Sequence, residues 1–586
     1  MNPEIRKTSQ YELPVRKSEA VDGYDVYPVH SIGDNKIQSS YHSLAARLPE
    51  KGVVKLDGYV GILFEEVRRG LTQALEELNI DAHWITMEDA LLPNDQVQQR
   101  IAPYLGGDDP IFGKVCPLSL NDFFDTRKLK EISSATTTQL TIYYGSGAAL
   151  VPGDGTLVYF DIAKNEIQFR ARAGTVHNIG AREKEDSKRM YKHFYFVDWI
   201  VLNRHLKSII NDIDIFVDGQ RSDEITWIAG EEWRKEIQKL PLRPIRVRPW
   251  FEPGIWGGTW IKEHIDGLET NVINYAWSFE LITPENGVVL ESNGLMLETS
   301  FDALMYLAGG DVLGVDAKKY GDVFPIRFDF LDTFNGANLS VQCHPKKEYM
   351  LAHFGEPITQ EETYYILDRQ KDATVFLGLQ QGVTKEKLKS ALEHSFLHKE
   401  PIAIEQIVQS FPAEKHALYL IPPGTIHASG KDTLVLEISA TPYIYTFKLY
   451  DWLRLDLDGK PRPLNIDRGM ENIELSYSGN YVPEKLIAHP VVLDNTANYD
   501  LVHLPTHKEH LYDVHRYRLI NEVEVRTNNK VHVLSLVEGT HIEIIIDGNS
   551  FRYAYAETVI IPARVNNYTI RNADKTPALV IKAFIK

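Results

Sequence analysis

The sequence is poor in cysteine. Only Cys116 and Cys343 occur in 586 residues, and they lie far apart. This excludes a disulfide framework and a Cys-x-x-Cys metal site, and it is typical of a reducing compartment. No run of 18 or more apolar residues occurs, and the first residues, Met-Asn-Pro-Glu-Ile-Arg-Lys, are polar. We therefore expect no membrane-spanning helix and no secretory signal, and we predict a soluble cytoplasmic protein without a membrane partner.

Positive charge is also in short supply. The chain has 63 basic and 81 acidic residues, which gives a formal net charge of -18 at pH 7. Such a field repels polyanions, so nucleic acid is not an expected partner. A few local cations could still hold a small anionic substrate. Composition does not determine the oligomeric state.

The length excludes a single hydrophobic core and predicts two to four domains. Hydrophobic residues make up 43% and aromatic residues 10% of the chain. This is the composition of globular domains rich in residues that favour strands.

The first 240 residues show two patterns. Residues 1–50 are polar and lack apolar periodicity, so we interpret them as an arm. From Val53 a strand, a glycine turn and an amphipathic helix over residues 64–78 follow one another. Further strands are expected at 140–144, 156–161 and 214–218, and a helical stretch at 194–210. We predict an α/β domain over residues 51–240.

The segment from Pro241 to Trp250 contains three prolines and three arginines and suits a domain junction. Beyond it, short runs of Val, Ile, Tyr and Phe alternate with Gly, Pro, Asn and Asp turns, interrupted by a helix expected at 385–394. This pattern predicts a β-barrel or sandwich domain over 241–474, with that helical insertion, and a second, smaller β-barrel over 475–586. The predicted fold class is therefore multidomain, α/β followed by mainly β.

The most informative strand is Leu339-Ser-Val-Gln-Cys-His-Pro345. Strand alternation places Leu339, Val341 and Cys343 on one face and Ser340, Gln342 and His344 on the other. The first face can pack and the second can bind.

Two further residues suit a metal site with that polar face. Glu362 opens an otherwise apolar and aromatic strand, and His427 follows a Pro-Pro-Gly-Thr turn. Taken singly, each has an ordinary structural explanation, such as an ion pair or a hairpin turn. Two imidazoles, one carboxylate and the amide of Gln342 together make a zinc site with room for water or substrate.

A series of ordered motifs resembles the type I mannose-6-phosphate isomerases. Trp256-Gly-Gly-Thr resembles the family's Trp-Gly-Gly signature, and Leu-Ser-Val-Gln-Cys-His-Pro its Leu-Ser-Val-Gln-Val-His-Pro. Glu362-Thr-Tyr-Tyr-Ile, Pro422-Pro-Gly-Thr-Ile-His-Ala, Leu436-Glu437 and Tyr450-Asp-Trp-Leu-Arg454 follow in the family's order. The resemblance covers residues 245–586.

The resemblance implies a fold, a cofactor and site residues. The implied fold is a set of cupin-type β-barrels, and the implied cofactor is one zinc ion per chain. The implied zinc ligands are His344, Glu362 and His427, with Gln342 as a fourth or nearby ligand. Catalytic roles are implied for Glu437, Lys448 and Arg454, and substrate contacts for Arg327, Lys448 and Trp256.

The implied reaction is the interconversion of mannose 6-phosphate and fructose 6-phosphate. A proton moves between C1 and C2 through an enediolate, so a base must lie beside the carbon and an electrophile beside the oxygens. Alternation in Leu434-Val-Leu-Glu-Ile-Ser places Glu437 and Ser439 on a polar face, as expected of a base, although a structural ion pair would place Glu437 in the same way.

Two departures from the family pattern concern the substrate. Lys448 stands where the family has an active-site arginine, which keeps the charge but loses the planar fork. Asp329 stands where the family has a lysine, so the charge is reversed at this position. Arg327 offsets the reversed charge if the strand is regular, because the two side chains then share one face. A related isomerase with a different sugar phosphate as substrate is therefore a second hypothesis. The residue pattern is also compatible with a cupin oxygenase, with another metal hydrolase and with a non-catalytic sugar-phosphate-binding cupin.

The α/β part faintly resembles uridine-kinase-like P-loop proteins. Lys55-Leu-Asp-Gly-Tyr-Val-Gly-Ile-Leu-Phe has the order strand, glycine turn, helix. It lacks the Gly-Lys-Ser/Thr that holds nucleotide phosphates and magnesium. We therefore predict a degenerate, non-catalytic kinase-like domain.

Overall fold

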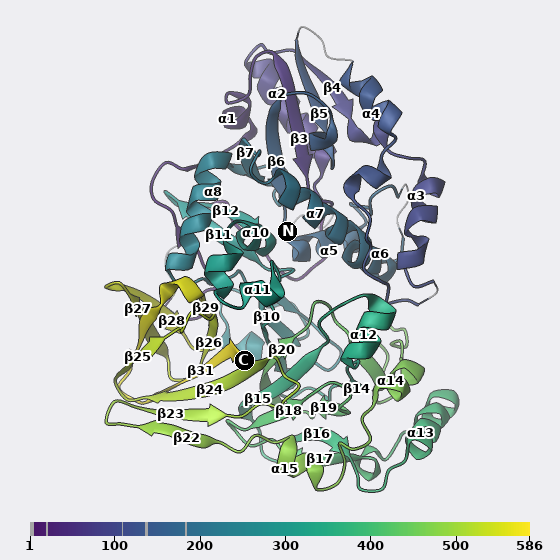
Figure 1. The fold of residues 1–586 in the computed structure, drawn as a ribbon, viewed down its shortest axis with the longest axis vertical. Coiled ribbons are helices and arrows are strands. Elements are labelled where there is room, and N and C mark those ends of the chain that lie inside the picture. Colours follow the sequence, from purple (N-terminus) through teal and green to yellow (C-terminus); the bar gives the residue numbers. More distant parts are fainter. Residues whose placement is uncertain (1–4, 19–21, 108, 135–138, 182–184) are drawn as a thin grey trace. The chain divides into compact units, whose positions relative to one another are not determined.

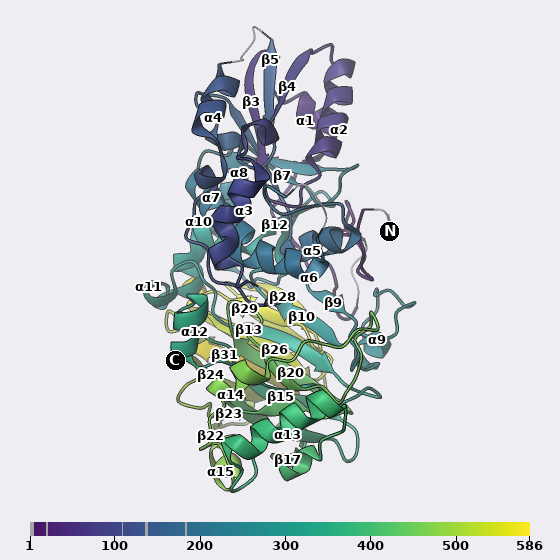
Figure 2. The same cartoon turned by 90° about the vertical axis from the view of Figure 1, so that its right-hand side faces the viewer.

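The computed structural model describes residues 5–18, 22–107, 109–134, 139–181 and 185–586. The chain divides into two compact units. The N-terminal unit contains residues 1–20, 27–240 and 283–308, and the C-terminal unit contains residues 21–26, 241–282 and 309–586. The predicted order of an α/β part followed by mainly β parts is confirmed (Figures 1 and 2).

The N-terminal unit is built on a seven-stranded sheet in the order β2-β8-β7-β6-β3-β5-β4. The five strands from β7 to β4 run parallel; β8 pairs antiparallel with β7, and β2 pairs antiparallel with β8. The strands are β2 (Ile37–Ser39), β3 (Gly52–Gly58), β4 (Ala82–Thr86), β5 (Leu140–Tyr144), β6 (Thr156–Asp161), β7 (Ile215–Asp218) and β8 (Thr226–Ala229).

Hydrophobic burial explains the centre of this sheet. Every residue of β5 and β7 is buried, as expected of parallel strands covered on both faces. The helices are α1 (Tyr41–Ala45), α2 (Phe64–Glu77), α3 (Asn94–Ile101), α4 (Thr126–Ser133), α5 (Lys164–Ala173), α6 (Ser187–His193), α7 (Trp199–Ile209) and α8 (Gly230–Lys239). The helical stretch expected at 194–210 contains a π-helical turn at Phe194–Asp198 before α7.

Two segments join this unit in ways that the sequence analysis did not anticipate. Residues before 50 are not only an arm, since β2 extends the sheet and β1 (His30–Ser31) pairs with β11 (Gly287–Ser292). The hairpin of β11 and β12 (Leu295–Ser300) comes from beyond the predicted junction at 241. Strands of two and three residues are too short to show an apolar period, and the return of a distant hairpin leaves no local signal.

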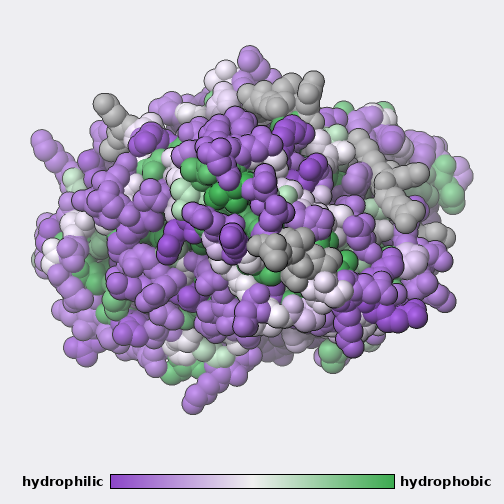
Figure 3. Space-filling model, turned by 90° about the horizontal axis from the view of Figure 1, so that it is seen from above, coloured by the Kyte–Doolittle hydropathy of each residue, from purple (hydrophilic) through white to green (hydrophobic). Residues whose placement is uncertain are grey.

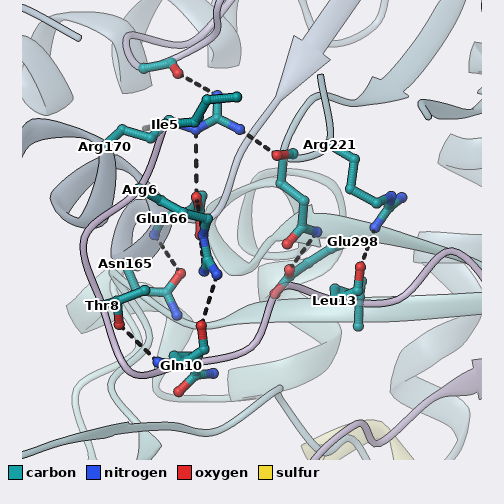
Figure 4. A network of polar contacts seen from close by, with 12 residues as sticks. Ile5, Arg6, Thr8, Gln10, Leu13, Asn165, Glu166, Arg170, Arg221 and Glu298 are labelled. Atoms are coloured by element: carbon teal, nitrogen blue, oxygen red, sulfur yellow. Dashed lines mark hydrogen bonds and ion pairs between the residues drawn. The ribbon is translucent and has the colours of Figure 1, made fainter. Parts of the chain in front are cut away.

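The polar network in Figure 4 attaches the N-terminal segment to α5. Arg6 donates hydrogen bonds to the Glu166 carboxylate, with Nη2 2.7 Å from Oε2, and both side chains are buried. Arg170 lies beside the same carboxylate and donates to the carbonyl of Gly61, 2.8 Å away. A buried carboxylate shared by two arginines is compensated, so this network orders the segment.

The turn between β3 and α2 differs from a phosphate-binding loop. Val60 and Ile62 in this turn are buried, and a Cβ on Gly61 would lie 2.8 Å from Ile167. Near the end of β3, the Asp57 carboxylate accepts hydrogen bonds from the backbone N–H groups of Gly147 and Ala149. Apolar side chains thus fill the turn, and the P-loop resemblance is not confirmed.

The C-terminal unit contains two pairs of antiparallel sheets. The first pair is a six-stranded sheet, β18-β15-β20-β13-β10-β9, and a five-stranded sheet, β17-β16-β19-β14-β21. Its strands are β9 (Trp250–Glu252), β10 (Trp277–Leu281), β13 (Arg327–Asp332), β14 (Val341–Cys343), β15 (Glu361–Arg369), β16 (Thr374–Leu379), β17 (Val408–Pro412), β18 (Leu418–Ile421), β19 (His427–Ser429), β20 (Thr433–Ala440) and β21 (Phe447–Tyr450).

Helices accompany this first pair of sheets. They are α9 (Trp260–His264), α11 (Ala317–Tyr320), α12 (Lys347–Phe354), α13 (Lys385–His398), α14 (Ile466–Asn472) and α15 (Tyr481–Lys485). The predicted insertion at 385–394 corresponds to α13, which is one turn longer. A further helix, α10 (Phe301–Leu313), begins in the N-terminal unit.

The second pair of sheets forms the last part of the chain. It has a six-stranded sheet, β22-β23-β24-β31-β26-β29, and a four-stranded sheet, β25-β30-β27-β28. The strands are β22 (Val491–Asn495), β23 (Tyr499–Leu504), β24 (Tyr512–Leu519), β25 (Glu522–Arg526), β26 (His532–Glu538), β27 (His541–Ile546), β28 (Asn549–Ala554), β29 (Thr558–Ile561), β30 (Asn567–Asn572) and β31 (Ala578–Ile585). Both sheets contribute to one apolar core that includes Leu534, Ile544, Ile570 and Val580, so we call this part the C-terminal barrel.

The Trp-Gly-Gly motif has a packing role. A Cβ on Gly257 would lie 2.3 Å from Asn274 Oδ1, and one on Gly258 would lie 2.1 Å from Asp332 Oδ1. Asp332 in turn accepts hydrogen bonds from the backbone N–H groups of Ile261 and Phe334. Only glycine fits where the chain approaches these buried side chains so closely.

We expect Gly258→Ala to destabilise the protein by about 1 to 3 kcal/mol, because the methyl group must displace a buried carboxylate and a backbone amide. Thermal unfolding followed by circular dichroism would measure this. The matched control is Gly310→Ala in α10, where the added Cβ meets no atom within 4 Å. An unchanged melting temperature for Gly258→Ala would contradict the packing role.

The surface view in Figure 3 is mainly hydrophilic, with hydrophobic residues in small, separate patches. Among the described residues, no helix combines the length and apolar character that crossing a bilayer requires.

Candidate metal centre

Facing strands of the first pair of sheets bring polar side chains together. Gln342 lies in β14, His344 follows that strand directly, and His427 opens β19. Glu362 comes from β15 in the opposite sheet. The apolar alternate positions, such as Val341 and Cys343, are buried, as the predicted two-faced strand requires.

Three of these side chains form the one group among the described residues that could hold a metal ion through His, Cys, Asp or Glu. The ligand atoms of His344, Glu362 and His427 all lie within 4.8 Å of one another. His344 Nε2 is 2.9 Å from Glu362 Oε1, and His427 Nε2 is 3.5 Å from Glu362 Oε2. All three residues are buried.

Backbone carbonyls orient both imidazoles. His344 Nδ1 lies 3.1 Å from the carbonyl of Tyr445, and His427 Nδ1 lies 2.9 Å from the carbonyl of Thr425. Because a carbonyl can only accept, each Nδ1 carries the proton that it donates, and in the neutral tautomer the lone pair of Nε2 faces the carboxylate. The Pro-Pro-Gly-Thr turn supplies one of these carbonyls, and its Gly424 has a φ of +82° that favours glycine.

The donor atoms fit a divalent cation. In the described part of the chain, His344 Nε2 and Glu362 Oε2 are buried without a hydrogen-bond partner. A lone pair on a neutral imidazole facing a carboxylate is unfavourable unless a proton or a cation lies between them. Two nitrogens and a carboxylate are ligands that zinc accepts.

Gln342 is placed beside this group. Its Nε2 is 3.4 Å from His427 Nε2, and Ser340 Oγ lies 3.4 Å from its Oε1. A half-turn of the amide would present its oxygen to the group, which is the atom that binds metal ions.

Burial alone would raise the pKa of the Glu362 carboxyl, but His344 and His427 outweigh burial and hold this pKa well below its usual range. Burial also lowers the pKa of His427. The direction for Glu362 favours an ionised carboxylate and the direction for His427 favours a neutral imidazole, and a metal-binding site needs both.

Glu437 lies at the centre of the six-stranded sheet, close to two acidic residues. In register it is opposite Asp329 on β13 and Tyr364 on β15, two residues from Glu362. Burial, together with the charges of Asp329 and Glu362, raises the pKa of Glu437 well above its usual range. Burial and the charge of Glu362 also raise the pKa of Asp329, which Arg327 partly offsets. An acid with a raised pKa can hold and release a proton near neutral pH.

One predicted cation, Arg327, lies on a strand of this acidic group, and the other, Lys448, lies in the other sheet of the pair. Strand β13 pairs regularly with β20 over residues 327–332, so Arg327 and Asp329 share a face. Arg327 is buried and donates to the carbonyl of Pro442, 2.7 Å away. Lys448 in β21 is half-buried and lies opposite Gln342.

Two predicted site residues have structural contacts instead. Trp256 is 1% exposed and packs edge-to-face on Trp277, with ring centroids 4.6 Å apart. Arg454 donates to the Asp451 carboxylate, which Arg462 also contacts. These contacts hold both side chains in place, and Nη1 of Arg454 is buried without a hydrogen-bond partner among the described residues. We leave Trp256 and Arg454 out of the site that we propose, and their predicted roles stay predictions.

Sequence reasoning missed Gln360. Its amide nitrogen donates to Glu362 Oε1, and its oxygen accepts from the backbone N–H of Tyr445. It thus links the carboxylate to the segment whose carbonyl orients His344. Its position two residues before Glu362, on the same strand face, was the available signal.

Comparison with known proteins separates the two parts of the chain. Residues 40–241 match a family described as a domain of unknown function, DUF8485.

The similarities to curated proteins cover about half of the chain. Over 304 residues the chain is 26% identical to the mannose-6-phosphate isomerase ManA of Bacillus subtilis. This match covers 51% of this chain and 87% of that protein. It is 24% identical over 241 residues to the mannose-6-phosphate isomerase of Streptococcus mutans, covering 41% of this chain and 71% of that protein.

Solved structures of similarly named proteins also align. A mannose 6-phosphate isomerase from Bacillus subtilis aligns over 58% of this chain and 99% of its own, with 20% identity and a TM-score of 0.48. A putative mannosephosphate isomerase from Archaeoglobus fulgidus aligns with 15% identity over 59% of this chain and 99% of its own, with a TM-score of 0.43. From the curated relatives and the motifs together, we conclude that about half of this chain is homologous to the type I mannose-6-phosphate isomerases.

Proposed function

We propose that this chain is a zinc-dependent aldose-ketose isomerase that interconverts mannose 6-phosphate and fructose 6-phosphate. The observation that carries this proposal is the buried group of His344, Glu362 and His427. Glu437 lies on the neighbouring strand β20, opposite Tyr364, which is two residues from Glu362. The names of the curated relatives support the reaction class.

In this proposal His344 Nε2, Glu362 and His427 Nε2 hold one zinc ion, and the amide oxygen of Gln342 is a fourth ligand. Zinc, when bound, polarises the substrate carbonyl and stabilises the negative charge that develops on its oxygens. The carbonyls of Tyr445 and Thr425 keep the two imidazoles in the tautomer that leaves Nε2 free to bind.

Glu437 is the proposed proton carrier. As a carboxylate it takes the proton from C2 of the aldose, and as an acid it returns that proton to C1 of the enediolate, while the hydroxyl proton of O2 passes to O1. Its buried position, close to Asp329, keeps its pKa above that of an exposed carboxyl, which makes the carboxylate a stronger base toward the C2 proton.

The two cations give the substrate its place. We propose that Lys448 contacts the substrate oxygens or the phosphate. We propose that Arg327 offsets the charge of Asp329 and also faces the substrate. Because Lys448 and Asp329 replace an arginine and a lysine of the family pattern, a different sugar phosphate is the second candidate substrate. A coupled isomerase assay with a panel of aldose and ketose 6-phosphates tests both candidates, and a lack of turnover with every member would contradict the proposed reaction.

We expect Lys448→Met to lower kcat much more than it raises KM if Lys448 stabilises the enediolate, because that interaction strengthens only as charge develops. If Lys448 binds the phosphate, KM should rise instead. Steady-state kinetics with mannose 6-phosphate distinguish these results. An exposed lysine of the same unit, Lys575, supplies the control Lys575→Met. Normal kinetics for Lys448→Met would remove this residue from the site.

Lys448→Arg then reports on the substrate. Higher activity on mannose 6-phosphate would mean that the pocket accepts the planar guanidinium of the family pattern. Lower activity on that sugar, with turnover of another phosphate, would favour the altered substrate. Zinc and sugar-phosphate binding without turnover by the unmodified protein would identify a non-catalytic sugar-phosphate-binding cupin.

A further inference from the structure

Among the residues that the structure describes, a buried lysine of the C-terminal barrel has no counter-ion. Lys582 in β31 is 7% exposed. Within the described chain its ammonium group has no hydrogen bond or ion pair, and its neighbours are the rings of Tyr517 and Phe584, whose centroids lie 5.6 and 5.0 Å from Nζ. The side chain is largely removed from water, and two cation-π contacts compensate its ammonium group only in part.

Strand register places Lys582 on the inner face of the barrel. It follows Val580 by two residues, and Val580 belongs to the apolar core. Its partners across the sheet are His515 on β24 and Leu534 on β26, and Leu534 is also a core residue. The ammonium therefore points into the barrel, at the end where the apolar core gives way to polar side chains.

Two histidines join Lys582 on this face. His515 is partly buried, and its Nδ1 is buried without a partner in the described structure. His532 is buried, and its Nδ1 lies 2.9 Å from the hydroxyl of Tyr568. Phe584 lies between the histidines, with centroid distances of 4.9 Å to His515 and 6.1 Å to His532.

The acidic side chain nearby already has partners. Asp513 is in β24, two residues from His515, and its carboxylate lies 2.8 Å from His503 Nε2 and accepts from the backbone N–H of Thr506. Asp513 and Lys582 form no ion pair within the described residues. The cluster thus has three groups that can carry positive charge. The charge of Asp513 acts on His515, but no carboxylate among the described residues forms an ion pair with any of the three.

The pKa directions agree with this imbalance. Burial lowers the pKa of Lys582 to about 8. Burial and the charge of Lys582 lower the pKa of His515 to about 4 and that of His532 well below its usual range. A bound anion would raise all three pKa values, because each cationic form would gain an attractive partner.

We propose that Lys582, His515 and His532 form a second ligand site, which binds a small oxyanion, a phosphate or carboxylate group, inside the C-terminal barrel. A metal does not suit it, since an ammonium group repels cations and the described residues bring no metal-ligating set together here. The partial exposure of His515, Asp513 and Phe584 gives an ion access from solvent. Strands β24, β26 and β31 of this site are separate from the strands that carry the candidate metal centre (Figure 1).

Crystals of the full chain soaked in tungstate, a tetrahedral oxyanion with strong anomalous scattering, test the site directly. We expect an anomalous peak within hydrogen-bond distance of Lys582 Nζ, which competing inorganic phosphate abolishes. Competition by acetate as well would assign the site to carboxylates in general, and competition by phosphate alone to phosphate groups. Tungstate peaks elsewhere with none at Lys582 would overturn the proposal, and the wild-type protein suffices for this result.

Calorimetric titration with inorganic phosphate, against chloride at equal ionic strength, tests the residues. Lys582→Met keeps the aliphatic stem and should weaken this binding about tenfold or more, the usual effect of losing a charge-assisted hydrogen bond. The exposed Lys575→Met is the control and should bind as the wild type does. His344→Ala should also retain this binding, which separates it from phosphate at the metal centre. Unchanged affinity in a folded Lys582→Met protein would contradict the assignment.

Discussion

Purified His344→Ala and His427→Ala proteins should lack the zinc that the wild-type protein is expected to carry at about one ion per chain. Each substitution removes one of the two proposed imidazole ligands, and the proposed site has few others. Loss of even an outer partner of a ligand typically costs about 10- to 100-fold in affinity, so loss of a ligand should cost more than about 100-fold. Metal analysis by mass spectrometry, together with isomerase turnover, measures the effect.

The control is His394→Ala. His394 is an exposed residue of α13 that pairs with Glu400, and its removal should leave zinc and turnover unchanged. Thermal unfolding of each variant shows whether the barrel is intact. Full zinc retention by both ligand variants would refute the metal centre, and a metal other than zinc in the wild type would refute only the cofactor.

Glu437→Gln should lower kcat by about two to four orders of magnitude while zinc remains bound. A positioned acid or base usually contributes this much. Glutamine has nearly the same shape and can accept a hydrogen bond, but it cannot take the substrate proton. A coupled assay gives kcat, and exchange of the C2 proton with solvent deuterium reports on the proton transfer itself.

Glu361→Gln is the matched control for this substitution. Glu361 is also a buried carboxyl of the same sheet, and burial raises its pKa to about 7, but it lies on the opposite face of β15 and accepts from the backbone N–H of Leu511. A similar loss of turnover in both variants would point to general damage to the sheet. Normal turnover in Glu437→Gln would assign the proton transfer to another group.

Much of the candidate site was predictable from sequence because strand alternation is a local rule. In Leu-Ser-Val-Gln-Cys-His-Pro, the alternation of apolar and polar residues separates a packing face from a binding face, and the structure places Gln342 and His344 beside His427. Gln360 could have been found by the same rule. The orientation of His344 could not, because its partner is the backbone carbonyl of Tyr445, 101 residues away.

Composition and periodicity determined the fold class and several elements. Strands β5 and β6 begin and end where the apolar runs predict, and α2 and α13 begin where expected. These elements depend on burial of a face or a stripe that is written in consecutive residues.

Motif residues whose role is packing were not separable by sequence from residues that bind. Trp256 belongs to a family signature, and its predicted substrate contact stays a prediction; the structure shows it buried on Trp277, and the glycines after it admit Asn274 and Asp332. Arg454 likewise ends a motif and pairs with Asp451. A motif shows that a side chain is needed, whereas its neighbours in the fold show what it is needed for.

The sequence alone thus determined the α/β-then-β order, the polar strand faces and the ligand types, since each follows from residues close together in the chain. Tertiary structure decided the return of the β11–β12 hairpin to the N-terminal unit, the acidic surroundings of Glu437 and the convergence of Lys582, His515 and His532. These features join segments far apart in sequence, and their energies arise only when folding brings the segments together and removes water from between them.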